Sequence, residues 1–328
     1  MAFCSSNDVN LEIIKNLGGK FEFIISLMTL NKASYHFIKK TTIYEEIIKL
    51  FNNLSNAKLL SNKIKICCQC NLLNLLEMII KLSKHTETKK CMFKFAAKFG
   101  NIKIFELFKS HIRQKFITII IVKAAKHGNI NVLEWFLNSS FDFECPKDAI
   151  DLAAAYGHIN VLDWFMHTDL VFRYSSEAVN MAAKNGHIPV LNWFRDSGLK
   201  FKYNEDAMNM AVKYARIDVL DWFMSSDYEI YYENLINMAA KYARIDVLDW
   251  FMSSNYEMYY EDALNQAIMC GHMNVIQWFF NSGLDIIISV EAINKALEKG
   301  FVEIYNLFYD DDDQNSNIEN NDQNEYSE

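Results

Sequence analysis

The six tryptophans of this chain share one register, and this feature constrains the fold more than any other. They are Trp135, Trp164, Trp193, Trp222, Trp250 and Trp278, separated by 29, 29, 29, 28 and 28 residues. The same step extends back to Leu107 and Met78 and forward to Leu307, so the pattern has nine positions. A fixed period of this length predicts a solenoid, in which each repeat packs on its neighbours in the chain.

Two of the repeats are nearly copies of one another. Residues 213–226 and 241–254 both read KYARIDVLDWFMSS. Identity over fourteen residues indicates duplication of one repeat rather than a shared composition.

Each repeat predicts two helices joined by a tight turn. In residues 177–203 the first helix, over 177–184, has an acidic start and small apolar residues. Gly186 then suits a left-handed turn, and Pro189 suits the first turn of a second helix. That helix carries an amphipathic stripe that includes Val190, Leu191 and Phe194. Large apolar or aromatic residues alternate with other residues over 199–203, 228–232 and 256–260, which predicts short extended connectors.

The composition favours the same all-α fold class. Of 328 residues, 51% are hydrophobic, and only 2 are proline and 10 glycine. A chain with this much apolar material can bury a sizeable core, and the shortage of turn-forming residues argues against a β-sandwich. We therefore expect about nine helical repeats of 28–29 residues.

At this point the repeats resemble the ankyrin repeat, whose pattern is TPLHLAA, two variable residues, Gly-His, a second helix and a glycine. The segments DAIDLAA (148–154), EAVNMAA (177–183) and DAMNMAV (206–212) resemble the first part. Gly157-His158, Gly186-His187 and Gly271-His272 resemble the turn, and Gly198 and Gly283 match the terminal glycine. The pattern is similar to the short Trp-containing ankyrin repeats of large DNA viruses and some protists.

The chain departs from the family pattern in three ways. Asp or Glu with Ala replaces the Thr-Pro start, and an asparagine replaces the family histidine of the first helix. The period is 28 or 29 residues instead of about 33. The missing residues fall between Gly198 and Asp206, where the family has its β-hairpin finger.

The resemblance implies a surface for protein partners at the ends of the first helices, which line the concave side of an ankyrin array. The column before the turn reads Lys98, Lys126, Ala155, Lys184, Lys213 and Lys241, and the next column reads Phe99, His127, Tyr156, Asn185, Tyr214 and Tyr242. Such a stripe suits an acidic or phosphorylated protein segment. Its alternative is an ordinary solvated helix face. The candidate partner-binding residues are Lys184, Lys213, Tyr214, Arg216, Lys241, Tyr242 and Arg244.

Two further columns are assigned structural roles between repeats. The six tryptophans are expected in the core between neighbouring repeats. The asparagine column is expected to form hydrogen bonds between repeats, as the family histidine does. Its members are Asn180, Asn209, Asn237, Asn265 and Asn294.

No motif predicts catalysis, a cofactor or a metal site. Cys67 and Cys68 fall in two columns that are mostly alanine elsewhere, and Cys70 has no second ligand pair at zinc spacing. The chain has no phosphate-binding glycine loop, nucleophile elbow or HExxH sequence. We therefore expect a non-enzymatic protein-interaction scaffold without cofactors.

The ends of the chain differ from the array. We divide the chain into a helical module at 1–58, the repeats at 59–309 and an acidic, disordered tail at 310–328. Within 1–58, the segment ISLMTLNKASYHFIKKTTIY (25–44) resembles the second half of an F-box. That resemblance implies an alternative function, a substrate adaptor of a cullin-type ubiquitin ligase. The other interpretation of 1–58 is a cap on the first repeat.

Charge and targeting signals set the remaining expectations. Residues 1–120 carry 19 basic and 8 acidic side chains, but these lysines are scattered, so neither nucleic acid nor membrane is the expected partner. The start of the chain lacks the pattern of a secretory signal, and seven cysteines without a disulfide spacing fit a reducing compartment. We expect an intracellular, soluble, cytoplasmic protein, in the host cytoplasm if it is viral.

Overall fold

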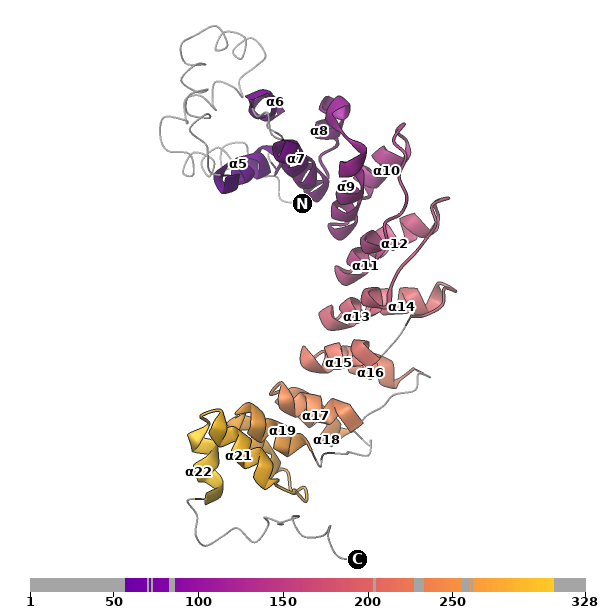
Figure 1. Ribbon diagram of the computed structural model, residues 1–328. Coiled ribbons are helices and arrows are strands. Elements are labelled where there is room, and N and C mark those ends of the chain that lie inside the picture. Colours follow the sequence, from indigo (N-terminus) through magenta and orange to yellow (C-terminus); the bar gives the residue numbers. More distant parts are fainter. Residues whose placement is uncertain are drawn as a thin grey trace, which may run out of the picture. The chain divides into compact units, whose positions relative to one another are not determined.

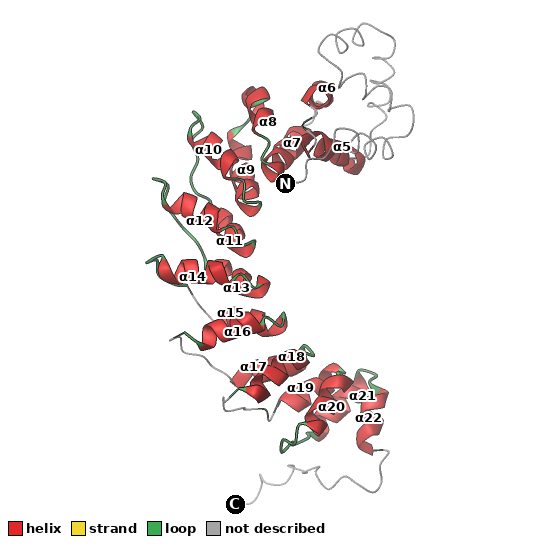
Figure 2. Cartoon of the chain, turned by 180° about the vertical axis from the view of Figure 1, so that it is seen from behind, coloured by secondary structure: helices red, strands yellow, loops and turns green. Residues whose placement is uncertain are grey.

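The computed structural model describes residues 57–69, 71, 73–82, 86–202, 205–226, 233–254, 260 and 262–309. These residues form eighteen α-helices and one 3-10 turn, and no strand occurs among them (Figures 1 and 2). The predictions for the tail at 310–328 and for the N-terminal module, apart from its last two residues, lie outside this part of the chain. None of the described helices is both long enough and apolar enough to cross a bilayer.

The helices form nine consecutive pairs, which confirms the prediction of an all-helical repeat fold. The first helices are α5 (Ala57–Gln69), α7 (Thr86–Phe99), α9 (Gln114–Lys126), α11 (Lys147–Ala155), α13 (Ser176–Asn185), α15 (Glu205–Lys213), α17 (Glu233–Lys241), α19 (Ala263–Cys270) and α21 (Val290–Glu298). The second helices are α6 (Leu73–Leu82), α8 (Ile102–Leu107), α10 (Ile130–Leu137), α12 (Ile159–Met166), α14 (Ile188–Asp196), α16 (Ile217–Met224), α18 (Ile245–Ser253), α20 (Met273–Asn281) and α22 (Val302–Tyr309). The 3-10 turn, Lys109–His111, follows α8.

The chain divides into two compact bodies, which we describe separately. The N-terminal body contains the described residues up to Ala153 and His158–Arg173, and the C-terminal body contains Ala154–Gly157 and the residues from Tyr174 onward. In the N-terminal body α7 packs between α5 and α9, and α10 packs between α8 and α12. In the C-terminal body the first helices α13, α15, α17, α19 and α21 pack on one another in chain order (Figure 1).

Small residues on the first helices and branched or aromatic residues on the second helices make the core. Ala182 and Ala183 of α13 are fully buried, and their size lets neighbouring first helices approach closely. Val190, Leu191 and Phe194 of α14 are also buried, at the spacing of one helical face. The most deeply buried large column is phenylalanine: Phe136, Phe165, Phe194, Phe223, Phe251 and Phe279.

The turn between the two helices of a repeat requires a left-handed residue. Gly186 has φ of 76°. Its backbone N–H donates to the backbone oxygen of Ala183, and the N–H of His187 donates to that of Ala182, so both bonds close the end of α13. Pro189 stands in the first turn of α14, as predicted. In the copied repeats Ala215 and Ala243 hold the same left-handed conformation, with φ of 52° and 53°. An L-residue with a Cβ is strained there, so these two turns are less relaxed than the glycine turns.

The predicted extended connectors lie only partly within the described residues. Residues 199–202 have no regular secondary structure, and 228–232 lie outside the described residues, as do 256–259. In the last repeat Leu297 and Val302 are exposed. Ala183, which has the same register in α13 as Leu297 has in α21, is buried. The array therefore ends in an atypical helix pair.

Candidate functional site

The candidate partner-binding residues lie together at one end of the first helices in the C-terminal body. Lys184 is in the last turn of α13, and Lys213 and Lys241 are the last residues of α15 and α17. Tyr214 and Tyr242 follow directly in the turns, and Arg216 and Arg244 follow each left-handed alanine. The seven residues therefore form one stripe across consecutive repeats, which we call the lysine–tyrosine stripe.

Lysines and tyrosines of this stripe interact from one repeat to the next. The Nζ atom of Lys184 lies 4.6 Å from the ring centroid of Tyr214, and that of Lys213 lies 4.5 Å from the ring of Tyr242. Tyr214 is 38% exposed, so the pair is accessible at the surface. A cation–π contact at an exposed site contributes about 0.5–1 kcal/mol, which is enough to favour one placement of each ammonium group.

The two arginines of the stripe have a structural role that the sequence analysis did not assign. Nε of Arg216 donates to the backbone oxygen of Lys184 at 2.9 Å, and Nε of Arg244 donates to that of Lys213 at 2.8 Å. Each arginine therefore satisfies a carbonyl at the end of the preceding first helix, where helical partners are missing. These bonds join neighbouring repeats, a role in addition to the partner binding that the sequence predicts for the two arginines.

The same contact recurs in other repeats, at the residue after the left-handed turn. We call these residues the turn-following column. Asn129 donates through Nδ2 to the backbone oxygens of Ala97 and Lys98, both at 2.8 Å. The further contacts are Asn101 to Cys68, His158 to Lys126 and His272 to Lys241, at 3.0, 3.0 and 2.9 Å. The signal that could have revealed them is a hydrogen-bonding side chain directly after nearly every turn.

The tryptophans link the second helices, at the edge of the core rather than in its centre. In the C-terminal body the indole N–H groups of three tryptophans donate to side chains of the preceding repeat: Trp222 to Asn192 (2.7 Å), Trp250 to Asp221 (2.8 Å) and Trp278 to Asp249 (2.7 Å). In the N-terminal body the ring of Trp135 lies 5.5 Å from that of Phe105. Trp222 is buried, but Trp135, Trp164, Trp193, Trp250 and Trp278 are only half-buried. The expectation of a core tryptophan column is therefore corrected, since the phenylalanine after each tryptophan takes the core position.

Asn265 of the asparagine column forms a hydrogen bond between neighbouring repeats. Oδ1 of Asn265 accepts a hydrogen bond from the backbone N–H of Ser289 at 2.9 Å. The Oδ1 atoms of Asn180 and Asn237 are buried without a hydrogen-bond partner, so these two oxygens do not form the contact that Oδ1 of Asn265 forms. Asn209 is half-buried and Asn294 is exposed at the end of the array.

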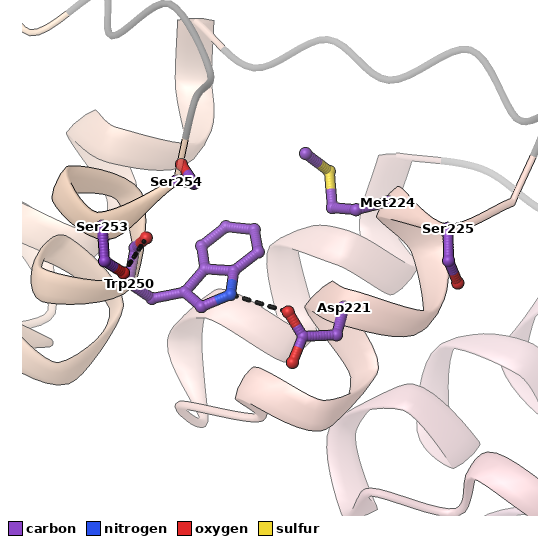
Figure 3. Close-up of a pocket in the computed structure, with 6 residues that line it drawn as sticks. All are labelled: Asp221, Met224, Ser225, Trp250, Ser253 and Ser254. Carbon is purple, nitrogen blue, oxygen red and sulfur yellow. Dashed lines mark hydrogen bonds between the residues drawn. The ribbon is translucent and has the colours of Figure 1, made fainter.

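A groove lies between the second helices of the copied repeats. It has a volume of about 340 Å³. One side is lined by Asp221 and Met224 of α16 and by Ser225, which follows that helix. The other side is lined by Trp250 and Ser253 of α18 and by Ser254, which follows that helix. Figure 3 shows the indole of Trp250 reaching from α18 toward the carboxylate of Asp221. None of the sequence patterns described above indicated this groove.

The described cysteines are free thiols: Cys67, Cys68 and Cys145 are buried, and Cys91 and Cys270 are half-buried. Cys67 and Cys68 lie in the core on α5, and Sγ of Cys68 is 3.6 Å from the backbone oxygen of Met92. Burial, together with the nearby thiols of Cys67 and Cys91, raises the pKa of Cys68. Cys70 lies outside the described residues, and no cluster of three potential metal ligands occurs within them.

No protein-family model matches the chain. No curated protein matches it either.

Proposed function

We propose that the chain is an ankyrin-like array that acts as a non-catalytic scaffold and binds an acidic or phosphorylated protein segment along the lysine–tyrosine stripe. Two features support the ankyrin type: a helix, a left-handed turn and a second helix repeat every 28 or 29 residues, and Gly-His occupies several of the turns. In ankyrin arrays this end of the first helices lines the concave side, which is the side that the stripe occupies under this proposal.

The observation that carries the proposal is the ordered spacing of cations along the stripe. Lys184 and Lys213 are each held over a tyrosine of the next repeat, and Lys241 is exposed at the end of α17. Neighbouring helices pack about 8–10 Å apart, so these ammonium groups recur at a spacing that an extended acidic segment can match. Tyrosines add apolar contact area at a low entropy cost.

The experiment measures binding of acidic and phosphorylated peptides to the full chain, with an uncharged peptide of equal length as a reference. In the stripe variant Lys184, Lys213 and Lys241 are changed to Gln. In the control variant Lys65, Lys103 and Lys147, which are exposed elsewhere, are changed to Gln. Exposed ion pairs contribute about 0.2–1 kcal/mol each, so the stripe variant should bind about tenfold more weakly.

The control separates a specific site from net charge. Both variants lose three positive charges, so an effect of net charge alone would be equal in the two. Because binding is expected at the stripe, the control variant should keep most of the affinity. Equal losses in the two variants, or no preference for the acidic peptides, would contradict the proposal.

A further inference from the structure

The chain itself shows how a cation is held beside a tryptophan between two second helices. In the last turn of α14, the guanidinium carbon of Arg195 lies 5.6 Å from the ring centroid of Trp222 on α16. The same guanidinium donates through Nε and Nη2 to the carboxylate of Asp196, at 2.8 and 3.3 Å. In the N-terminal body Lys109 stands in the same register and its Nζ lies 5.9 Å from the ring of Trp135. A tryptophan of one repeat thus receives a cation from the repeat before it.

In the next repeat the register is the same, but the residue types differ. Arg195 and Asp196 stand two and three residues after Trp193, and the corresponding residues after Trp222 are Met224 and Ser225. These two residues line the groove, together with Trp250 on the facing helix. A neutral pair therefore stands where the preceding repeat has an ion pair, and the groove opens at that place (Figure 3).

A second substitution changes the charge of the groove. Trp222 donates its N–H to the neutral amide of Asn192, whereas Trp250 donates to the carboxylate of Asp221. A carboxylate can accept about four hydrogen bonds, and the indole N–H supplies one. The hydroxyls of Ser253 and Ser254 donate to backbone oxygens of Trp250 and Phe251, which leaves their oxygens able to accept. The groove is thus built from an aromatic ring, one negative charge and hydroxyl acceptors.

We propose that this groove binds the guanidinium group of an arginine in a basic, extended segment of a protein partner. The arginine would lie against Trp250 and Asp221 as Arg195 lies against Trp222 and Asp196. Guanidinium fits better than the ammonium of lysine because it is planar, stacks on aromatic rings and carries five donors. The inference goes beyond the proposed function, because the groove is on the second helices and favours the opposite charge from the lysine–tyrosine stripe.

The following repeat offers the same residue types one step along the array. Asp249 accepts the N–H of Trp278 at 2.7 Å, and Met252, which corresponds to Met224, is 41% exposed. Neighbouring helices lie about 8–10 Å apart, and three residues of extended chain span about 10 Å. The partner segment should therefore carry two arginines separated by two residues.

The test uses a peptide of the sequence GRGGRG with blocked ends and a control peptide with citrulline in place of both arginines. Citrulline keeps the shape of the side chain but has no charge. Binding is followed through the indole N–H resonances of the six tryptophans, with the resonance of Trp250 identified by the Trp250→Phe variant. The arginine peptide should shift the Trp250 resonance in a saturable, salt-sensitive way, and the citrulline peptide should not.

Two variants test the groove without removing its tryptophan. The double variant Met224→Arg with Ser225→Asp transplants the Arg195–Asp196 pair into the groove and should abolish the shift of the Trp250 resonance. Asp221→Asn copies Asn192, so it should keep the indole hydrogen bond and weaken binding about two- to fivefold. Asp218→Asn, an exposed change on the same helix outside the groove, should have no effect. Thermal unfolding of each variant checks that the fold is intact.

Any of three results from the comparisons between peptides or variants would overturn the inference. They are equal binding of the citrulline peptide, an unchanged Trp250 shift in the double variant, and equal effects of Asp221→Asn and Asp218→Asn. The absence of any shift with the arginine peptide would also overturn it.

Discussion

The backbone φ angles of the two left-handed alanines predict how their replacement changes the free energy of unfolding. Ala215 and Ala243 hold φ of 52° and 53°, where glycine stands in neighbouring repeats. The left-handed conformation costs an L-residue about 1–2 kcal/mol. Glycine relieves that strain but gains about 0.4–1 kcal/mol of chain entropy in the unfolded state. Each Ala→Gly change should therefore stabilise the protein by about 0.5–1 kcal/mol.

The reverse change supplies the matched test. Gly186 has φ of 76°, and a Cβ added there would lie 3.6 Å from its nearest neighbour, Cδ of Arg216. Since that is an ordinary contact, Gly186→Ala adds backbone strain without a clash and should destabilise the protein by about the same amount. Ala240→Gly, three residues before Ala243 within α17, is the composition control and should destabilise by about 1 kcal/mol.

The assay is urea unfolding followed by tryptophan fluorescence and by circular dichroism. Two probes are needed because repeat arrays can unfold in parts. The double variant Ala215→Gly with Ala243→Gly should raise the midpoint, and Gly186→Ala and Ala240→Gly should lower it. A lower midpoint for the double variant, or a higher one for Gly186→Ala, would refute the argument from φ.

Three further predictions concern the glycine turns, the core and pH. Gly128→Ala should destabilise by about 2–3 kcal/mol, more than Gly186→Ala, because its Cβ would lie 2.8 Å from Nδ1 of His158; equal thermal shifts for the two would contradict this. Phe194→Ala should cost about 3–5 kcal/mol and Trp193→Ala less, since Phe194 is fully buried and Trp193 half-buried; urea unfolding gives the ranking, and the opposite order would place the tryptophans in the core. Burial, with the charges of Lys98 and Lys126, lowers the pKa of His127. As the pH falls, His127 is therefore protonated in the unfolded chain before it is protonated in the folded protein. The free energy of unfolding should decrease as the pH drops from about 6.5 toward the lowered pKa. His127→Gln should flatten that decline in unfolding midpoints measured at several pH values, and an unchanged slope would count against this histidine.

The repeat fold was predictable because its signals are local or strictly periodic. The tryptophan register, the alanines of the first helices and Gly186 each report a feature that one repeat needs to fold. Helix pairs and turns followed directly from them. The tryptophan column was placed too deep, because its periodicity does not reveal which of two adjacent aromatic residues faces the core.

The contacts between repeats were harder to predict because they join residues about 30 positions apart. The turn-following column contains asparagine, histidine and arginine, so its members share a position and a bond but no residue type. Arg216 was interpreted as a surface cation because only its distance to Lys184 reveals its hydrogen bond. The groove required a comparison of Arg195 with Met224 in register, together with the packing of α16 against α18. Neither is visible in a single repeat.

The hydrogen bonds of the turn-following column all have the same direction along the array. Each of its bonds runs backward, from a new repeat to the helix that precedes it, so a repeat brings its own donor and leaves its own carbonyls open for a successor. A copied repeat therefore finds a fitting neighbour on both sides, because the parent offers the same acceptor that the copy will offer next. Arg216 and Arg244, in the two segments that read KYARIDVLDWFMSS, make the same bond with their predecessors. Lengthening by duplication thus needs no compensating change in the neighbouring repeats.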